Sequence, residues 1–227
     1  MKKPRLIDRG LRKLAGYLKP ILIPLRRAII NNDDFTIISN NCWGGVVYEY
    51  YGLPKMSPTV GSWFFAADYL KFVGNLKYYL SLDIQVCPSV ESRYYSKLLE
   101  MGSADCVIGK LEDIEVIMLH YHDPKEAKEK WERRKKRVNY DNLIVKFSYM
   151  NECTLSDLSQ FDQMDLSHIS PNCKKIMFVP KPMEGMESAV YYKGFESDPQ
   201  ITNDTYFFNR YFNLPAFING GGIIPRH

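Results

Sequence analysis

The sequence lacks the cysteine pattern of a structural metal site. Its five cysteines, at positions 42, 87, 106, 153 and 173, are far apart, and no two of them are separated by only two residues. A four-thiolate zinc site is therefore not expected. Cys87 and Cys106 lie in strand-like apolar stretches, where a cysteine is usually a small buried hydrophobic residue.

Long hydrophobic segments are also missing. The apolar run PILIPL, at residues 20–25, is far too short to span a bilayer. No signal peptide with a small-residue cleavage site is recognisable, so a reducing cytoplasm is the expected location. Internal repeats and low-complexity linkers are absent too, and nothing after residue 33 marks a second domain boundary.

Acidic residues are scarce at the N-terminus. Residues 1–32 contain nine Lys or Arg and one acid, Asp8, a net charge of +8, whereas the whole chain carries +4 and the remainder therefore −4. Leucines recur in this segment at roughly helical spacing, although Pro20 and Pro24 interrupt the pattern. The sequence thus predicts a basic helical arm at 1–32 and an α/β domain at 33–227.

Two interpretations of this arm stay open. It either lies on an anionic membrane surface, which makes the protein peripheral at the inner face of the membrane, or packs on the domain with its charges in water. The prolines favour the second interpretation, because an interfacial helix rarely contains two of them. The body of the chain is acidic and has no nucleic-acid-binding motif, so no nucleic acid partner is expected.

What the sequence does contain is a core-forming composition, with 45% hydrophobic residues in a chain of 227, and alternating elements. The patterns predict strands at 35–39, 105–111, 114–122, 143–149, 174–180 and 189–195, a short extended piece at 84–89, and helices at 61–80, 92–102, 124–139, 154–164 and 204–213. The tight connection at 112–113 predicts a hairpin. The alternation predicts an α/β fold with a mixed β-sheet flanked by helices.

The stretch after the first predicted strand is unusual in composition. It reads Asn40, Asn41, Cys42, Trp43, Gly44 and Gly45. Ligands of open α/β sheets bind where loops leave the carboxyl ends of strands. The glycines are expected to adopt positive φ near a ligand, the asparagines to offer amide groups, and Cys42 to be a nucleophile whose pKa is lowered by backbone N–H groups. The alternative is a tight turn with a buried cysteine and a packed tryptophan.

Two of the four histidines lie together near the end of the strand predicted at 114–122. If the strand continues, His120 and His122 point to the same side, and one of them is expected to share a cleft with Cys42 as its general base. Asp123 is a further candidate catalytic residue. The alternative is a pair of surface histidines followed by an aspartate that caps the next helix. A metal site is not expected, because a further histidine at the required spacing is missing.

A third segment, residues 52–62 (GLPKMSPTVGS), is stiffened by two prolines. Ser57 and Thr59 are expected to present hydroxyl groups just ahead of the helix predicted at 61–80, where a phosphate or carboxylate would bind. The alternative is an ordinary loop that ends in a helix cap at Ser62.

The blocks NNCWGG, SPT-x-G and DYLKF-x-x-NL-x-YYL, followed by HYHD, KFSYMNE and KKIMFVP, extend from residue 33 roughly to the end of the chain. They resemble an uncharacterised bacterial family whose members are usually labelled exopolysaccharide biosynthesis proteins. The basic arm is not part of the resemblance. The resemblance implies an α/β fold and a link to cell-surface polysaccharide.

Three classes of function are consistent with these features, and one of them is a membrane-surface scaffold that depends on the basic arm. Of the other two, the first is a transferase that moves an acyl or glycosyl group from a coenzyme A ester or a nucleotide sugar to a polysaccharide precursor. Acyl transfer is supported by similarity to a capsule-biosynthesis family that binds coenzyme A and also carries an Asn-Cys pair after its first strand. The second is a non-catalytic accessory protein that binds a nucleotide sugar or a glycosyltransferase and does not need Cys42.

Overall fold

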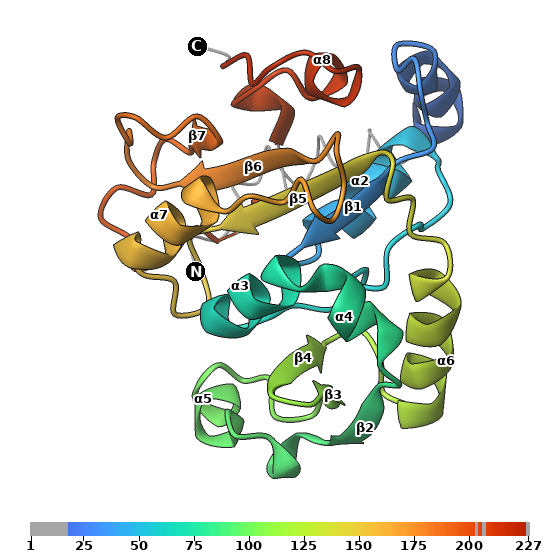
Figure 1. Ribbon diagram of the computed structural model, residues 1–227, viewed down its shortest axis with the longest axis vertical. Helices are drawn as coiled ribbons and strands as arrows, with labels where there is room; N and C mark the ends of the chain where they lie inside the picture. The colour runs from blue at the N-terminus through green and yellow to red at the C-terminus, as the bar shows by residue number, and fades with distance from the viewer. Residues whose placement is uncertain (1–17, 203, 206–207, 226–227) are drawn as a thin grey trace.

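The computed structural model describes residues 18–202, 204–205 and 208–225, and two β-sheets form its framework (Figure 1). The parallel sheet has the order β1-β5-β6-β7, with strands Thr36–Ser39, Leu143–Ser148, Lys174–Val179 and Ala189–Tyr191. The antiparallel sheet has the order β2-β3-β4, with strands Gln85–Pro88, Val107–Leu111 and Ile114–Met118. The α/β class is confirmed, and the parallel and antiparallel pairs fall in separate sheets.

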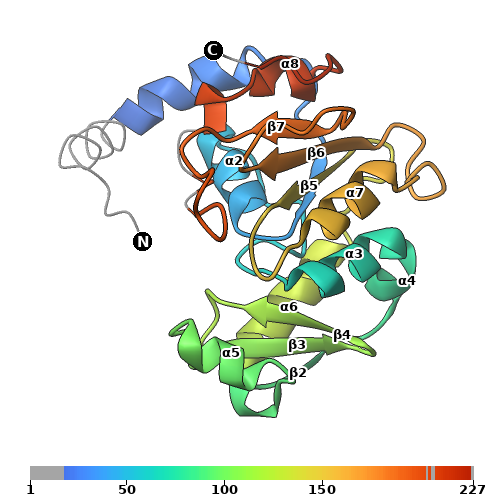
Figure 2. The ribbon, with the colours of Figure 1, turned by 90° about the vertical axis from the view of Figure 1, so that its left-hand side faces the viewer.

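Helices cover both faces of the parallel sheet (Figure 2). Helix α2 (Trp43–Tyr51) packs on one face together with the C-terminal segment that contains η2 (Phe208–Arg210) and α8 (Leu214–Ile218). The other face is covered by α3 (Ala66–Gly74), α4 (Leu76–Ser81) and α7 (Leu155–Gln163). The second sheet lies beyond α3 and is flanked by η1 (Ser89–Glu91), α5 (Tyr95–Glu100) and α6 (Pro124–Lys135).

The central strand β5 explains how the sheet separates two buried clusters. All six of its residues are buried, which is typical of a strand covered on both faces. Leu143, Val145 and Phe147 join the cluster under α3 and α7, whereas Ile144 joins the cluster under α2. Lys146 follows on the α2 side and is the one charged residue of this strand.

Several local predictions are confirmed. Thr154 and Asp157 form a capping box at the start of α7, since each side chain bonds the backbone N–H of the other residue. Strands β3 and β4 form the expected antiparallel hairpin. Asp123 caps α6, because its carboxylate accepts the backbone N–H of Lys125 at 3.0 Å.

The helix predicted at 61–80 is wrong in its first turn and is divided in two. Residues 61–65 are not helical, and Trp63 instead exchanges both backbone hydrogen bonds with Ile117 at the end of β4. Ser62 does not cap a helix, and its buried hydroxyl has no partner within the described part of the chain. Asn75 separates α3 from α4. Pairing with a distant strand overrides the local helical pattern here.

The described part of the predicted arm packs on the domain. Residues 18–27 are helical, and residues 1–17 lie outside the described residues. Lys19 forms an ion pair with Glu49, and Ile23 packs so closely over Gly52 that a Cβ there would approach its side chain to 2.5 Å. The division at residues 32 and 33 stays a prediction. Across the described residues, no helix has both the length and the apolar character needed to cross a membrane.

The helix predicted at 204–213 lies partly outside the described residues, because 206 and 207 are not described. Of the remainder, residues 208–210 form the short 3₁₀ helix η2. The helix α8 that follows starts at Leu214, where Asn213 accepts the backbone N–H of Ala216.

Candidate functional site

Asn40 and Asn41, the two asparagines that follow β1, form the buried side of the site. Asn40 is fully buried and bonds both backbone groups of Ser148 at 3.1 Å, so its side chain extends the pairing of β1 with β5. Asn41 is also buried; its amide oxygen accepts from Lys146 Nζ at 3.0 Å and from the Trp43 backbone N–H at 3.1 Å. The expected amide groups are therefore used inside the protein, and Asn41 alone also lines a cavity.

A buried ion pair lies next to Asn41. Lys146 Nζ contacts Asp204 Oδ2, and neither side chain is more than 2% exposed. Asp204 also accepts from Asn41 Nδ2 at 2.9 Å and from Ser148 Oγ at 2.5 Å. Burial lowers the pKa of Lys146, while the Asp204 carboxylate opposes this effect. The network fixes the loop between β1 and α2 because each buried charge needs its partners.

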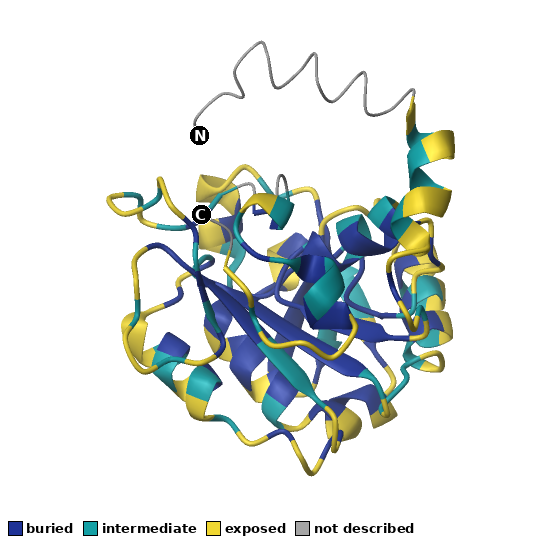
Figure 3. Ribbon diagram, turned by 90° about the horizontal axis from the view of Figure 1, so that it is seen from above, coloured by how far each residue is buried: buried dark blue, intermediate teal, exposed yellow. Residues whose placement is uncertain are grey.

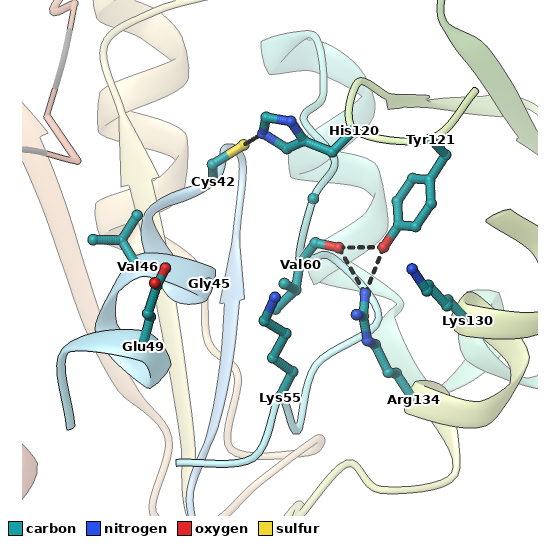
Figure 4. A pocket seen from close by; sticks show the side chains of 11 residues that line it. Cys42, Gly45, Val46, Glu49, Lys55, Val60, His120, Tyr121, Lys130 and Arg134 are labelled. Carbon is teal, nitrogen blue, oxygen red and sulfur yellow. Dashed lines mark hydrogen bonds between the residues drawn. The ribbon is translucent and has the colours of Figure 1, made fainter. Parts of the chain in front are cut away.

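Cys42 stands above this network at the N-cap position of α2. Its Sγ lies 3.3 Å from Nε2 of His120, within hydrogen-bond range for sulfur (Figure 4). Burial is the main cause that raises the pKa of Cys42 from 9.0 to about 11; Asp204 also raises it and Lys146 lowers it. The expected lowering of this pKa is therefore wrong. The thiol is protonated at neutral pH, and an unprotonated Nε2 can accept its proton.

His120 reaches Cys42 by a route that the sequence does not indicate. The two residues follow strands of different sheets, and β4 already ends at Met118. The backbone N–H of His120 bonds to the Gly61 carbonyl at 3.2 Å, next to the Trp63 pairing with β4. Gly61 has φ of +85°, and a Cβ there would lie 3.1 Å from the Tyr121 hydroxyl. The next residue, Phe64, donates its backbone N–H to the Asn40 carbonyl at 3.0 Å, so residues 61–64 tie the second sheet to the end of β1.

Gly44 and Gly45 serve packing rather than unusual backbone angles. Both lie in the first turn of α2, and neither has a positive φ. A Cβ on Gly44 would lie 3.0 Å from the Ile37 side chain, and one on Gly45 would lie 3.0 Å from Val60. The expected positive φ is wrong, because the helix starts directly after Cys42 and must approach β1 closely.

Trp43 is fully buried and is not a ligand platform. Its ring meets Phe178 edge-on at 5.7 Å and Phe208 at 5.8 Å. The alternative of a packed tryptophan therefore describes this residue, and its role is to anchor the first turn of α2 in the core.

Ser57 and Thr59 do not present hydroxyl groups to solvent. Both are buried, their hydroxyl oxygens lie 2.9 Å apart, and Thr59 Oγ1 accepts the Ser39 backbone N–H at 3.3 Å. The predicted anion site at these hydroxyls is wrong, because internal hydrogen bonds occupy them. They hold the loop 57–61 against the end of β1.

His122 and Asp123 lie away from Cys42. Both are exposed, and neither lines a cavity that contains Cys42. The strand ends at Met118, so His120 and His122 do not share the face that continued strand geometry would give them. The capping interpretation holds for Asp123, and His120 alone meets the thiol.

Cys42 and His120 lie on the boundary of two cavities. One, of about 290 Å³, is named here the basic cavity and is lined by the cationic residues Lys55, Lys130 and Arg134. The other, of about 440 Å³, is named the neutral cavity, and none of the described residues that line it is a Lys or an Arg. Its walls are Trp63, Met101, Leu119 and Met150, with polar groups from Asn41, Ser103, Asn151, Gln200, Asp204 and Thr205.

Three residues of the site, Lys146, Asp204 and Arg134, were not predicted from the sequence. Lys146 carried a usable signal, a lysine inside the apolar strand LIVKFS, since a charged residue there must have a buried partner. Asp204 and Arg134 carried none, because one lies in a polar segment and the other in a helix crowded with charges. Within the described ranges, no group of three or more His, Cys, Asp or Glu is placed to hold a metal ion.

Comparison with known proteins places the chain in a family. The model of the family described as domain of unknown function (DUF1919) matches residues 18–216, and the chain belongs to this family. A protein of Haemophilus influenzae described as an uncharacterized protein is 31% identical over 172 residues, which cover 76% of this chain and 74% of the relative. The family match begins inside the segment predicted as a separate arm.

Proposed function

We propose that this member of the DUF1919 family is a transferase of cell-surface polysaccharide biosynthesis that moves an acyl group through Cys42. The observation that carries the proposal is the approach of Cys42 Sγ to His120 Nε2, 3.3 Å apart, on the boundary of two cavities of different character. A nucleophile needs a base within hydrogen-bond reach and room for a donor and an acceptor. The pair has both.

The proposed reaction has two halves. In the first, Nε2 of His120 takes the thiol proton while the sulfur attacks the acyl carbonyl of an activated donor. The tetrahedral intermediate then expels the donor's leaving group, which receives that proton, and an acyl thioester remains on Cys42. In the second half, an acceptor hydroxyl gives its proton to Nε2 and attacks the thioester. The sulfur leaves and regains the proton from the imidazole.

The raised pKa of Cys42, about 11, fits this general-base mechanism. At neutral pH almost no free thiolate exists, so the attack depends on proton transfer to His120 within the transition state. A positioned general base contributes about 10²–10⁴-fold to the rate. Gly45, in the first turn of α2, lines the basic cavity, and its backbone N–H has no acceptor among the described residues, so this donor is free to bind a developing oxyanion.

Acyl transfer has more support than glycosyl transfer. Enzymes that cleave glycosidic bonds usually rely on a pair of carboxylic acids at the bond. The carboxylates that line the two cavities, Asp204 and Glu49, are engaged with Lys146 and Lys19. The neutral cavity combines an indole with amide and hydroxyl groups, a suitable lining for a sugar acceptor. The link to polysaccharide itself rests on the resemblance of the sequence blocks.

The test is to search for the acyl intermediate. Purified protein is incubated with acetyl-coenzyme A or p-nitrophenyl acetate, and intact mass and peptide mapping locate any acetyl group. We expect one acetyl group on Cys42, none in Cys42→Ser, and about 10²–10⁴-fold slower loading in His120→Gln. Cys87→Ser is the matched control and should load normally. Normal transfer by Cys42→Ser would refute the proposal.

A second candidate, a non-catalytic accessory protein that binds a nucleotide sugar or a glycosyltransferase, is favoured by the raised pKa of the thiol. A cysteine that stays protonated can be a simple lining residue of a binding cleft. This candidate predicts that Cys42→Ser binds its ligand as well as the natural protein and never carries an acyl group.

We also propose that the protein is peripheral at an anionic membrane surface. The support is an outward apolar stripe on the N-terminal segment, formed by Leu18, Ile21, Leu25 and Ile29, which are 40%, 64%, 63% and 53% exposed. The stripe lies on a basic segment, a combination typical of interfacial helices.

A further inference from the structure

A buried arginine without an acidic partner lies beside the Cys42–His120 pair. Arg134 is only 6% exposed, and in the described part of the chain it forms no ion pair with a carboxylate. Its Nη1 donates to the Val60 carbonyl at 2.9 Å and to the Tyr121 hydroxyl at 2.5 Å (Figure 4). A guanidinium carries five N–H donors, so most of its donors are left for another partner.

Two lysines add to this positive charge. Lys55 and Lys130 line the same basic cavity, and in Figure 4 their ammonium ends lie on either side of the Arg134 guanidinium, below the Cys42–His120 pair. Lys130 forms an ion pair with Glu126, four residues earlier on the same helix, whereas Lys55 forms no ion pair with a described residue. Glu49, the one carboxylate among the described residues of the lining, pairs with Lys19.

Burying a cation without an anionic partner costs free energy of folding, and a bound anionic ligand offsets that cost. The spacing of Lys130 and Arg134, four residues apart on α6, puts both on one face of that helix. With Lys55 on the opposite wall, the cavity surrounds a bound group with cations from two elements. This arrangement favours a multiply charged anion over a carboxylate.

We infer that the basic cavity binds the phosphate groups of the activated donor, with the donor's reactive end directed toward Cys42. The volume of about 290 Å³ is at the lower end of ligand pockets, so the cavity takes a phosphate or diphosphate group rather than a whole nucleotide. Binding of the anion stands on the cavity alone. The statement that the anion belongs to the donor rests on the proposed function.

The test uses inorganic pyrophosphate, with coenzyme A and uridine diphosphate as separate arms that distinguish the two donor types. Binding to the full chain is measured by calorimetry at constant ionic strength. We expect pyrophosphate to bind, and the Lys55→Ala/Lys130→Ala double variant to bind roughly 10–100-fold more weakly. Both lysines are at least partly exposed, so these variants should fold. Lys125→Ala, on the exposed side of the same helix, is the matched control.

A second readout locates the ligand. Bound pyrophosphate should slow iodoacetamide labelling of Cys42, which lines the basic cavity, and leave Cys87, which does not, unchanged. No binding at millimolar pyrophosphate, or equal binding by the double variant, would overturn the inference. Acetyl loading of Cys42 without anion binding would defeat this inference alone. Anion binding without acetyl loading would instead defeat the acyl-transfer proposal and leave the anion site intact.

Discussion

At the scale of single residues, the surroundings of Cys42 decide its chemistry more than its position does. A cysteine at the start of a helix usually has a lowered pKa. Here burial and the carboxylate of Asp204 outweigh that effect and the opposing charge of Lys146. The sequence predicted that His120 or His122 would meet the thiol, and His120 does so. It did not predict this pKa, because neither the depth of the site nor the buried ion pair could be inferred from local patterns.

The first prediction concerns the reactivity of this thiol. The rate of Cys42 alkylation by iodoacetamide should rise with pH to a midpoint near 11, two units above the ordinary 9.0. The protonated form is the one that burial favours, so at neutral pH the thiolate fraction should be about 100-fold below that of an ordinary cysteine. Mass-spectrometric mapping across pH 7 to 11.5 measures the profile. A midpoint at or below 9 would contradict this account.

The second prediction concerns the buried ion pair. Asp204→Asn keeps the shape of the side chain but leaves the Lys146 charge uncompensated, so it should cost about 3–5 kcal/mol of unfolding free energy. Adding Lys146→Met to this variant should recover most of the loss. Denaturant unfolding at pH 7 measures both values. Equal stability of the two variants would show that the charge of Lys146 is compensated by other groups.

Asp204→Asn also allows a test of how the free energy of unfolding changes with pH. The pKa of Lys146 is lowered in the folded protein from 10.5, so the unfolded chain binds the proton more tightly. Stability therefore rises as the pH increases between the folded pKa and 10.5. In Asp204→Asn the opposing carboxylate is gone, the folded pKa falls further, and this rise should begin at lower pH than in the natural protein.

At the scale of elements, the sequence predicted correctly the helices and strands whose formation depends on contacts between residues close in the chain. The capping box of α7, the β3–β4 hairpin and the buried strand β5 all follow from short-range signals in the sequence. The segment 61–65 did not, because Trp63 pairs with Ile117 of β4, 54 residues away in the sequence. That long-range pairing also positions His120 near Cys42. The segment that the sequence failed to predict is therefore the one that brings the two residues of the site together.

The third prediction tests the role of the segment 61–65 by comparing substitutions at two glycines, Gly61 and Gly102. Gly61 and Gly102 both have positive φ, +85° and +66°, but only Gly61 lies against a side chain, with its hypothetical Cβ 3.1 Å from Tyr121 Oη. Gly102→Ala should cost only the backbone strain, about 1 kcal/mol, whereas Gly61→Ala should cost about 2–3 kcal/mol. Denaturant unfolding compares them. Gly61→Ala should also slow acetyl loading of Cys42, and Gly102→Ala should not.

At the scale of the whole molecule, the N-terminal helix, residues 18–27, has one side against the domain and one side exposed. Figure 3 shows exposed and half-buried parts along this helix. Its inner side is held by the Lys19–Glu49 pair and by Arg26 over the Tyr50 ring at 3.9 Å. Its outer side carries the apolar stripe of Leu18, Ile21, Leu25 and Ile29. Packing on the domain and lying on a membrane are therefore compatible, because each uses a different side of the same helix.

The last prediction follows from that division of faces. Natural protein should float with vesicles that contain anionic phosphatidylserine, less so at high salt, and hardly with neutral phosphatidylcholine vesicles. The variant Ile21→Ser/Leu25→Ser removes two of the most exposed apolar residues, at 64% and 63%, and should lose most of this binding while its unfolding free energy stays nearly unchanged. Val90→Ser, 62% exposed on the second sheet's side, is the matched control and should float normally.

Flotation that is equal for the stripe variant and the control would exclude the stripe as a membrane contact. Equal flotation with neutral and anionic vesicles would remove the electrostatic part of the argument, which depends on the net charge of +8 in residues 1–32. If both parts hold, α2 and the site lie close to the membrane, because the Lys19–Glu49 pair joins the basic segment to the helix that begins after Cys42.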